Sequence, residues 1–521
     1  MKKPIHTSTP TFRRLIEGGY VYVDKTRDIY DLVRELGGIY FLSRPRRFGK
    51  SLLISTLDEI FQGNKELFEG LWISESDYQW ATHPIIRVDF STKQVRSAEE
   101  LEDAIQTYLR RVAETYGINY AEDRFIQLDD LIWSLTKITL EEPSSNQVVI
   151  LVDEYDKPLV DNLHNLEEAK RIRDVMKGFY AGIKALDQHI RFVFITGISK
   201  FSKVSIFSEL NHLTDLTMRP AFATLLGLTE QELRDNFAEY IADFAQEEGM
   251  SDEEFLAEMR HWYNGFCFAP NAQNVYNPYS TAQLFSVRVF DNYWFESGTP
   301  TFLINLLHQQ NYPVEELNHL KRRKIAFDTF DLKNLSVVPL LFQTGYLTIK
   351  GYEKRDRLFT LDYPNYEVEE AFLTYLLDVF GYLEKGDSAV YILDLIQALK
   401  DDDIDLVFQI MKVLFANIDY DLHLDYEKYY QTIFYLTFKL IGVNINAEVK
   451  TDKGRIDAVI HLDDRIYLFE FKLDKTADEA LQQIKTDQYY QKYLGQRKPI
   501  ILIGANFSTE TKTVDDWKVE R

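Results

Sequence analysis

Short apolar runs alternate with helical patterns over the first 220 residues of the chain. Residues 148–152 and 192–196 are continuous apolar or β-branched stretches, which are typical of strands buried on both faces of a parallel sheet, and residues 39–43, apolar up to Ser43, indicate another short buried strand. Segment 50–62 carries its apolar residues at helical spacing, which predicts an amphipathic helix. We therefore predict an α/β domain with a parallel sheet over residues 1–222.

The pattern changes twice toward the C-terminus. Residues 223–412 have mostly helical periodicity and are rich in aromatic residues, so we predict a mainly helical middle region. Beyond it, a helical segment leads into three short alternating segments, another helix over 478–494 and a last strand over 498–507. We predict that residues 413–521 form a further α/β domain.

Composition narrows the class of protein. The 521 residues are 45% hydrophobic and 14% aromatic, which argues against disorder, and the single Cys267 excludes an intramolecular disulfide and a multi-cysteine zinc site. No run approaches 18 apolar residues and no signal-peptide pattern follows the basic start, so we expect a cytoplasmic protein with no membrane partner.

The formal net charge of −23 counts against a broad, non-specific grip on nucleic acid, which needs a basic surface. The net charge does not exclude a local basic groove around an active site.

The stretch FLSRPRRFGKSLL (41–53) ends like a phosphate-binding loop. Gly49, Lys50 and Ser51 fit the end of the pattern G-x-x-x-x-G-K-[ST], but Arg44 stands where the first glycine belongs. In such a loop the backbone N–H groups and the helix N-terminus face the anion, the lysine reaches the phosphates and the hydroxyl binds Mg²⁺. We expect ATP to contact the loop at Arg46, Arg47, Phe48, Gly49, Lys50, Ser51 and Leu52.

A second segment completes this nucleotide site. The apolar strand of VVILVDEYDKPL (148–159) ends in Asp153 and Glu154, which suit a Mg²⁺ ligand and a residue that polarises the attacking water. The next strand ends in a polar residue, Thr196 or Ser199, which could sense the γ-phosphate. The alternative is that the acidic pair only ends a strand and caps a helix.

Carboxylates and a lysine also fall on alternating segments of the tail. Glu470 and Lys472 are two apart, hence on one face of a strand. A two-residue turn at Asp463-Asp464 would place Asp457 opposite Glu470. A four-residue loop over 451–454 would place Glu448 opposite Asp457.

Like charges that face each other across a sheet cost stability unless a cation neutralises them. Oxygen ligands favour Mg²⁺, or Mn²⁺ as a substitute, so we expect Glu448, Asp457 and Glu470 to bind the metal. Lys472 would then orient water or phosphate for phosphodiester cleavage. Gln483 and Tyr489 on the next helix could face the same cleft. The alternative is a solvated face with scattered charge.

Other features carry two interpretations each. Aromatic residues of the middle region could stack on nucleobases, although such residues are more often core; they are Trp262, Tyr263, Tyr276, Tyr279, Trp294 and Phe295. Arg44, Arg46, Arg47 and Lys200 could contact phosphate or act in trans in a homo-oligomer, which the sequence leaves open. We expect Cys267 to be a buried thiol.

Several stretches along nearly the whole chain are distinctive as a set: YVDKT (22–26), SRPRRFGKSLL (43–53), LVDEYDKPL (151–159), TGISKFS (196–202), WYNGF (262–266), VYNPYS (275–280), GYLTI (345–349) and YPNYEV (363–368). They resemble the bacterial AAA-ATPase-like family, whose own loop reads R-P-R-R-F-G-K-S. The tail is similar to the PD-(D/E)XK nuclease domain often fused to that family, through Glu448, GRID (454–457), EFK (470–472) and ALQQIKTDQYY (480–490). Ile456 replaces the literal proline of that motif.

The resemblance implies an AAA-like ATPase domain over 1–222, a helical lid or middle region over 223–412 and a restriction-endonuclease-like domain over 413–521. It implies roles for Lys50, Ser51, Asp153 and Glu154 in binding and hydrolysing MgATP. In the nuclease domain it implies catalytic roles for Asp457, Glu470 and Lys472.

Two functions follow. The first is an ATP-driven, Mg²⁺-dependent nuclease acting on DNA or RNA, in a mobile-element or defence context by analogy. The second is a nucleotide-gated switch or scaffold whose C-terminal domain binds nucleic acid without cutting it.

Overall fold

The computed structural model describes most of the chain. Described are residues 2–7, 9–140, 145–200, 206–207, 210, 212–296, 301–310, 312–328, 336–416, 426–444, 447–452 and 455–521. Within these ranges, the side chains of residues 296, 301–302, 305, 309, 426–431, 443–444, 447–452, 455–457 and 489 lie outside the description.

The chain forms two compact units, which we treat separately. The first unit comprises Met1–Phe302 and Leu320–Asn365, and the second comprises Leu303–His319 and Tyr366–Arg521. The three-domain division expected from the sequence stays a prediction.

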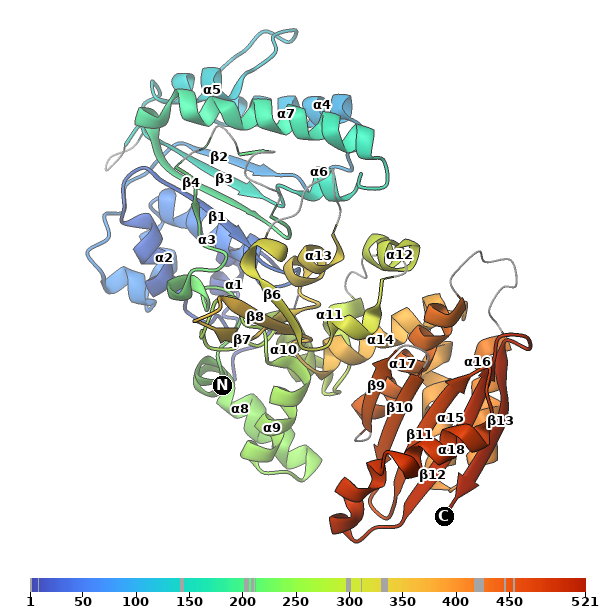
Figure 1. The fold of residues 1–521 in the computed structure, drawn as a ribbon. Helices are drawn as coiled ribbons and strands as arrows, with labels where there is room; N and C mark the ends of the chain where they lie inside the picture. The colour runs from blue at the N-terminus through green and yellow to red at the C-terminus, as the bar shows by residue number, and fades with distance from the viewer. Residues whose placement is uncertain are drawn as a thin grey trace. The chain divides into compact units, whose positions relative to one another are not determined.

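The first unit is built on a five-stranded parallel sheet with the order β2-β3-β4-β1-β5 (Figure 1). Its strands are β1 (Gly38–Ser43), β2 (Ile85–Asp89), β3 (Val148–Asp153), β4 (Ile190–Gly197) and β5 (Thr214–Asp215). Every residue of β3 and β4 is buried, which explains why both read as continuous apolar runs. The predicted parallel sheet is confirmed.

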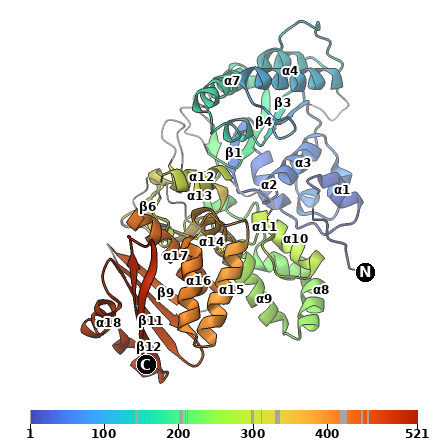
Figure 2. The same cartoon turned by 90° about the vertical axis from the view of Figure 1, so that its right-hand side faces the viewer.

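Helices cover both faces of this sheet. They are α1 (Phe12–Glu17), α2 (Thr26–Val33), α3 (Lys50–Phe61), α4 (Ala98–Thr115), α5 (Leu128–Leu135), α6 (Lys157–Val160) and α7 (Leu166–Ala185). Figures 1 and 2 show α4 and α7 on one side of the sheet and α3 on the other. The predicted helix after the glycine–lysine–serine stretch is therefore α3.

The remainder of the first unit is mostly helical. Its helices are α8 (Glu230–Glu248), α9 (Asp252–Tyr263), α10 (Pro278–Val287), α11 (Tyr293–Glu296) and α13 (Val337–Thr344). The sequence did not predict the three-stranded antiparallel sheet found there, with the order β6-β8-β7. Its strands, called here the small sheet, are β6 (Leu320–Arg323), β7 (Thr348–Glu353) and β8 (Leu358–Asp362).

The second unit packs helices on both faces of a mixed sheet with the order β13-β12-β11-β10-β9. Its strands are β9 (Ala447–Asp452), β10 (Arg455–His461), β11 (Ile466–Leu473), β12 (Ile500–Ser508) and β13 (Thr513–Glu520). Its helices are α14 (Tyr366–Phe380), α15 (Asp387–Lys400), α16 (Ile404–Ala416), α17 (Tyr426–Asn444) and α18 (Ala477–Thr486), with most of α12 (Thr301–Gln309). Figure 2 shows α18 on one face, and α16 and α17 on the other.

The predicted helix over 478–494 is interrupted. Helix α18 ends at Thr486, Gln488 adopts a left-handed backbone with φ 55°, and a 3-10 helix follows over Tyr489–Gln496. A left-handed residue ends a helix because its carbonyl turns away from the helix axis.

Among the described residues, no helix combines the length and the apolar character that a membrane crossing would require.

Candidate nucleotide site and candidate nuclease site

The glycine–lysine–serine stretch lies between strand β1 and helix α3. Gly49 is the residue before the helix and has φ 92°, a left-handed conformation that glycine adopts without strain. Lys50 and Ser51 begin α3, so the free backbone N–H groups of the helix lie beside them. The sequence-predicted loop therefore has the local geometry of an anion-binding site.

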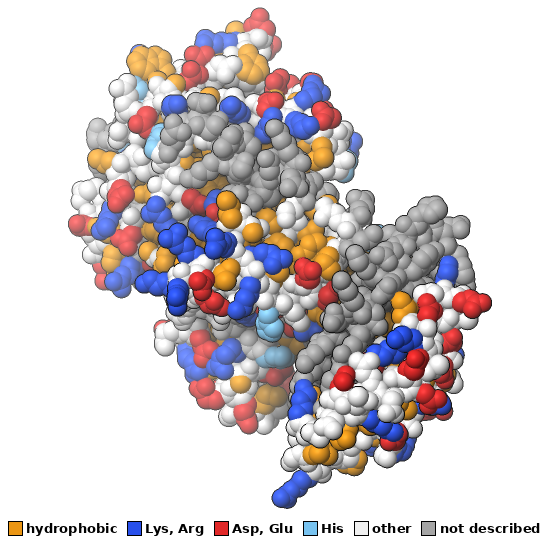
Figure 3. All heavy atoms as spheres, in the orientation of Figure 1, with side chains coloured by type: hydrophobic (Ala, Val, Ile, Leu, Met, Phe, Trp, Pro, Cys, Tyr) orange, Lys and Arg blue, Asp and Glu red, His pale blue; other side chains and the backbone are white. Residues whose placement is uncertain are grey.

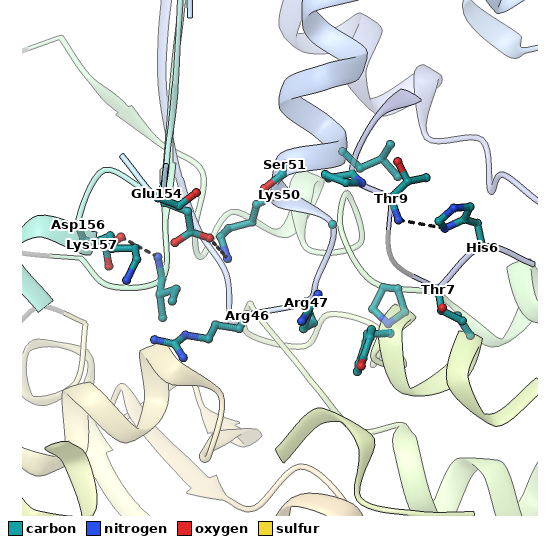
Figure 4. Close-up of a pocket in the computed structure, with 18 of the residues that line it drawn as sticks. His6, Thr7, Thr9, Arg46, Arg47, Lys50, Ser51, Glu154, Asp156 and Lys157 are labelled. Carbon is teal, nitrogen blue, oxygen red and sulfur yellow. Dashed lines mark hydrogen bonds and ion pairs between the residues drawn. The ribbon is translucent and has the colours of Figure 1, made fainter. Parts of the chain in front are cut away.

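A pocket of about 580 Å³ opens at this loop (Figure 4). Its walls combine the loop, the segment after β3, the N-terminal segment and the start of α10. Lining residues predicted from the sequence are Arg46, Arg47, Gly49, Lys50, Ser51, Leu52 and Glu154. Lining residues that the sequence did not single out for this site include His6, Thr7, Thr9, Asp156 and Lys157.

Lys50 is buried and held by the loop itself. Its ammonium donates to the carbonyl oxygens of Arg44 at 3.2 Å and Pro45 at 3.1 Å, and lies 3.4 Å from Glu154 Oε1. Figure 4 shows the Lys50 and Glu154 side chains pointing toward one another. Glu154 has φ 48°, a strained backbone for a residue with a side chain, and such strain tends to occur at functional sites.

Asp153 ends β3 and is 2% exposed. Burial raises the pKa of this carboxyl to about 6, and a hydrogen bond with Ser51 partly opposes the shift. A buried carboxyl next to the Ser51 hydroxyl offers the hard oxygen ligands that Mg²⁺ prefers.

Asp156 is a site residue that sequence reasoning missed. Its carboxylate accepts hydrogen bonds from the backbone N–H groups of Ile198 at 3.2 Å and Ser199 at 2.6 Å, and from the Ser199 hydroxyl. Burial raises its pKa. The sequence feature that could have indicated Asp156 is its position as the third acidic residue, after Asp153 and Glu154, at the end of β3. Asp156 thus joins the segment after β3 to the segment after β4.

Thr196 is fully buried, and its hydroxyl donates to the carbonyl oxygen of Leu42 at 2.8 Å. It is not among the residues that line the pocket. A phosphate contact would require the hydroxyl to leave Leu42, so its position favours a structural role. Ser199, the other residue considered, is engaged by Asp156.

Arg44 is a structural residue, because its guanidinium is buried and hydrogen-bonded to the backbone. It donates to the carbonyl oxygens of Ser43 and Thr217, both at 2.9 Å, and of Phe222 at 3.1 Å. Its guanidinium also lies 4.1 Å from the ring centroid of Phe268, and burial lowers its pKa to about 9. The hypothesis that Arg44 contacts phosphate is wrong for this arrangement.

The Lys200 ammonium is also engaged by other residues of the protein, in its case by two carboxylates. Its ammonium lies 2.6 Å from Asp215 and 2.8 Å from Asp328, and its backbone N–H donates to Gln343 Oε1 at 2.7 Å. Arg46 and Arg47, in contrast, are exposed and line the pocket. Of the four basic residues considered for phosphate, Arg46 and Arg47 line the pocket, and Arg44 and Lys200 do not.

Residues from the middle of the chain contact the glycine–lysine–serine loop through a hydrogen bond, a cation–π contact and aromatic packing. Trp294 Nε1 donates to the carbonyl oxygen of Arg46 at 3.0 Å. The Arg47 guanidinium lies 4.7 Å from the ring centroid of Tyr279, consistent with a cation–π contact. Phe48 does not line the pocket and packs edge-on against Phe266 and Phe268, with ring centroids 4.8 and 5.4 Å from its own.

Gly345 is a further residue from the middle of the chain that packs against the loop, at Pro45. A Cβ atom placed on it would lie 2.7 Å from Pro45 Cγ, closer than van der Waals contact allows, and its φ is 94°. The stretches WYNGF, VYNPYS and GYLTI therefore belong to the structural support of the phosphate loop.

The hairpin of the candidate nuclease site agrees in part with the sequence-based register. Asp457 pairs with Glu470 across β10 and β11, and the Leu462 N–H donates to Arg465 O at 2.9 Å around the predicted two-residue turn. This prediction is confirmed.

The predicted pairing of Glu448 with Asp457 is wrong. In the structure Asp457 pairs with Lys450 and Glu448 with Val459, because β9 continues to Asp452, two residues into the stretch expected to be a loop. A shift of two residues keeps the alternation of faces, so Glu448 moves along the sheet without changing face.

Lys472 and Glu470 form a buried pair in β11. Glu470 is 0% exposed and Lys472 9%, and the ammonium donates to Glu470 Oε1 at 2.7 Å. Gln483 of α18 accepts a second hydrogen bond from the same ammonium through its Oε1. The prediction that Gln483 faces this site is therefore confirmed.

The side chains of Glu448, Asp457 and Tyr489 lie outside the described residues. Among the side chains that are described, no three acidic, histidine or cysteine residues are grouped to hold a metal. The metal-ligand roles of Glu448, Asp457 and Glu470 stay predictions.

Most of the aromatic residues considered for base stacking are core. Tyr263 and Tyr276 are fully buried, and Cys267 is buried as expected, with its thiol donating to the Ala269 carbonyl at 3.2 Å. Tyr279 differs, because it is half-buried and lines the nucleotide pocket.

Comparison with known proteins identifies a family for each of two regions of the chain. Residues 6–207 match the family described as "Predicted AAA-ATPase", and residues 425–517 match the PD-(D/E)XK nuclease superfamily. The chain is 36% identical to an uncharacterized protein in the vnfD 5′ region of Azotobacter chroococcum mcd 1, over 100% of this chain and 99% of that protein. No solved structure matches. The chain therefore belongs to the predicted AAA-ATPase family and carries a C-terminal domain of the PD-(D/E)XK nuclease superfamily.

Proposed function

We propose that this protein binds and hydrolyses ATP at the loop pocket and uses Mg²⁺ in its C-terminal domain to cleave phosphodiester bonds of DNA or RNA. The single observation that carries the proposal is that Lys50, Ser51 and Glu154 line one pocket while the buried Asp153 is hydrogen-bonded to Ser51, although about a hundred residues of chain separate the two pairs. Domains of these two kinds generally use a nucleotide and a divalent metal.

The pocket residues fit a nucleotide with its metal. Among the described residues, the Lys50 ammonium contacts only two carbonyl oxygens and Glu154, and phosphate oxygens are stronger acceptors for an ammonium than neutral carbonyls. Arg46 and Arg47 add two exposed positive charges at the same rim. Ser51 and Asp153 supply oxygen ligands, and bound Mg²⁺ would neutralise charge on the phosphates.

Glu154 is the residue placed to activate water. Its carboxylate is partly exposed to the pocket, with 20% of the side chain accessible, and its nearest cation is Lys50. When Lys50 turns to a phosphate, Glu154 loses that partner and becomes free to accept a proton from water. Asp153 is more deeply buried, which suits a ligand rather than a base.

In the second site, Lys472 is positioned by two acceptors. Glu470 and Gln483 fix its ammonium from the same strand and from the neighbouring helix. Asp457 stands opposite Glu470 in the strand register, so two carboxylate-bearing positions are adjacent on β10 and β11. This set of oxygen donors beside a fixed lysine suits Mg²⁺-assisted attack of water on a phosphodiester. Control of the nuclease by ATP is part of the proposal.

The test is nuclease activity on single- and double-stranded DNA and RNA with Mg²⁺ or Mn²⁺, with and without ATP. Wild type is compared with Asp457→Ala and Lys50→Ala, and ATP hydrolysis is measured in parallel. We expect Asp457→Ala to lose cleavage and keep ATP hydrolysis, and Lys50→Ala to lose ATP hydrolysis and change cleavage. ATP hydrolysis without cleavage of any substrate by wild type would contradict the nuclease assignment and favour a nucleotide-gated switch.

A further inference from the structure

Exposed basic residues gather on the small sheet of the first unit, although the chain as a whole carries a net charge of −23. We call six of them the basic patch. They are Lys321, Arg323, Lys324, Lys354, Arg355 and Arg357, all exposed. Figure 3 shows lysine and arginine side chains clustered over this region of the face drawn.

Strand pairing brings the two parts of the basic patch together. Arg323, the last residue of β6, pairs with Leu358 of β8, and Leu358 pairs with Glu353 of β7 on its other side. The turn 354–357 joins β7 to β8 just beyond this row. Basic residues from two separate stretches of sequence therefore meet at one end of the small sheet.

Acidic neighbours offset part of this charge, since the exposed Asp356 lies between Arg355 and Arg357 in the turn. Lys321 lies 2.7 Å from Glu353, and Lys324 lies 3.7 Å from Asp328. Within the described part of the chain, the other four members, at positions 323, 354, 355 and 357, form no ion pair. Neighbouring like charges repel, so the arrangement costs stability and favours binding of an anion with several charges.

An apolar side chain stands within the basic patch. Ile325 follows Lys324 and is 87% exposed, the highest exposure among the large hydrophobic residues described. An exposed aliphatic side chain next to phosphate-binding residues is suited to contact the face of a base. This combination distinguishes the surface from a plain solvated charge run.

We propose that the basic patch binds the sugar-phosphate backbone of a nucleic acid strand, with Ile325 contacting a base. This inference rests on the proposed nuclease function and adds the place where the first unit holds the substrate. A repeating phosphate backbone fits several cations in a row, whereas a single small anion would engage only one or two.

The experiment measures binding without catalysis. Full-length protein is titrated into a fluorescein-labelled DNA strand, the same DNA as a duplex and RNA of the same sequence, in EDTA and without ATP, over a series of KCl concentrations. The test variant is K354E/R355E/R357E. The matched control is R96E/R111E/K137E, which makes the same charge change at exposed positions elsewhere in the first unit.

We expect the test variant to bind at least about ten-fold more weakly, and the slope of log affinity against log salt to fall by about 2 to 3. The control should keep wild-type binding. Ile325→Ala should weaken binding while leaving the salt slope unchanged. The strand, duplex and RNA arms then identify which nucleic acid is held.

Three outcomes would overturn the proposal. They are no binding of any probe by wild type, equal loss in the test and control variants, and equally tight binding of labelled polyglutamate, which would indicate an acidic protein partner. EDTA removes the metal, so the binding measurement does not depend on cleavage. If the protein proves not to be a nuclease, binding by the basic patch can still be observed. If the basic patch proves not to bind, cleavage can still be measured in a separate assay with Mg²⁺.

Discussion

The indole N–H of Trp294 donates a hydrogen bond to the carbonyl oxygen of Arg46 at 3.0 Å, across 248 residues of sequence. This bond fixes one peptide group of the phosphate loop from α11. The neighbouring loop residues Pro45, Arg47 and Phe48 are also held by side chains or backbone from the middle of the chain. The shape of the pocket at this loop therefore depends on residues far outside the glycine–lysine–serine stretch.

Trp294→Phe should weaken ATP binding and lower the stability of the fold only by about the 1 kcal/mol of one hydrogen bond. Phenylalanine keeps apolar packing against Tyr346 and Phe266 but cannot donate to Arg46. One hydrogen bond contributes about 1 kcal/mol, so we expect roughly five-fold weaker affinity by calorimetry. Trp133→Phe, at an exposed site on α5, is the control and should bind ATP like wild type. Unchanged affinity in Trp294→Phe would show that the bond does not shape the loop.

Gly345→Ala should damage both stability and nucleotide binding. The added Cβ would meet Pro45 Cγ at 2.7 Å, and the backbone at φ 94° disfavours any side chain. Gly70→Ala is a matched control, because Gly70 has φ 81° and open space around its Cβ position. The control should lose about 1 kcal/mol from backbone strain alone. A larger fall in Tm for Gly345→Ala, with weaker ATP binding, is expected, and equal shifts for both variants would refute the Pro45 contact.

Arg44→Gly should harm the protein, although it restores the glycine of the common phosphate-loop pattern. The substitution leaves three carbonyl oxygens without the guanidinium, and hydrogen bonds from a charged donor contribute about 1.5 to 3 kcal/mol each. We expect a loss of at least about 3 kcal/mol in thermal or chemical unfolding. Arg46→Gly, at an exposed position, should change stability much less. A stabilised Arg44→Gly protein would argue against the structural role of Arg44.

Gln483→Ala should slow phosphodiester cleavage. It removes one of the two acceptors that fix the Lys472 ammonium, and we expect roughly ten-fold lower kcat because a hydrogen bond to a charged group contributes about 1.5 to 3 kcal/mol. Gln483→Glu retains an acceptor and should recover part of the rate. Gln482→Ala changes the exposed neighbour and serves as the control. Equal rates for Gln482→Ala and Gln483→Ala would rule out a positioning role for Gln483.

Asp153→Asn should stabilise the nucleotide-free protein at neutral pH. Burial raises the pKa of Asp153 from 3.8 to about 6, so folding disfavours its charged form. The cost is absent below about pH 4, grows between pH 4 and 6, and is fully present above pH 6, at about 3 kcal/mol. The gain in Tm from Asp153→Asn should therefore be larger at pH 7.5 than at pH 5. The same gain at both pH values would contradict the raised pKa.

Local pattern predicted much of the first unit. The strands β1, β3 and β4 and the helix α3 follow from apolar spacing, because a buried strand and an amphipathic helix each impose a periodicity that neighbouring residues display. The pairing of Asp457 with Glu470 followed from the two-residue turn, because turn length fixes the register of a hairpin. The pairing of Glu448 could not be settled this way, since loops that differ by two residues give the same alternation of faces.

The sequence by itself determined the parallel sheet and the position of the glycine–lysine–serine loop. It also determined which acidic and basic side chains are candidates for each site. The tertiary structure alone decided that Arg44 clamps backbone carbonyls, that Asp156 joins two loops, and that Trp294 and Gly345 enclose the phosphate loop. It also decided that basic residues of β6 and of the turn after β7 form one patch. The physical reason is that periodicity reports only on neighbours along the chain, whereas these contacts join segments that packing brings together from distant positions.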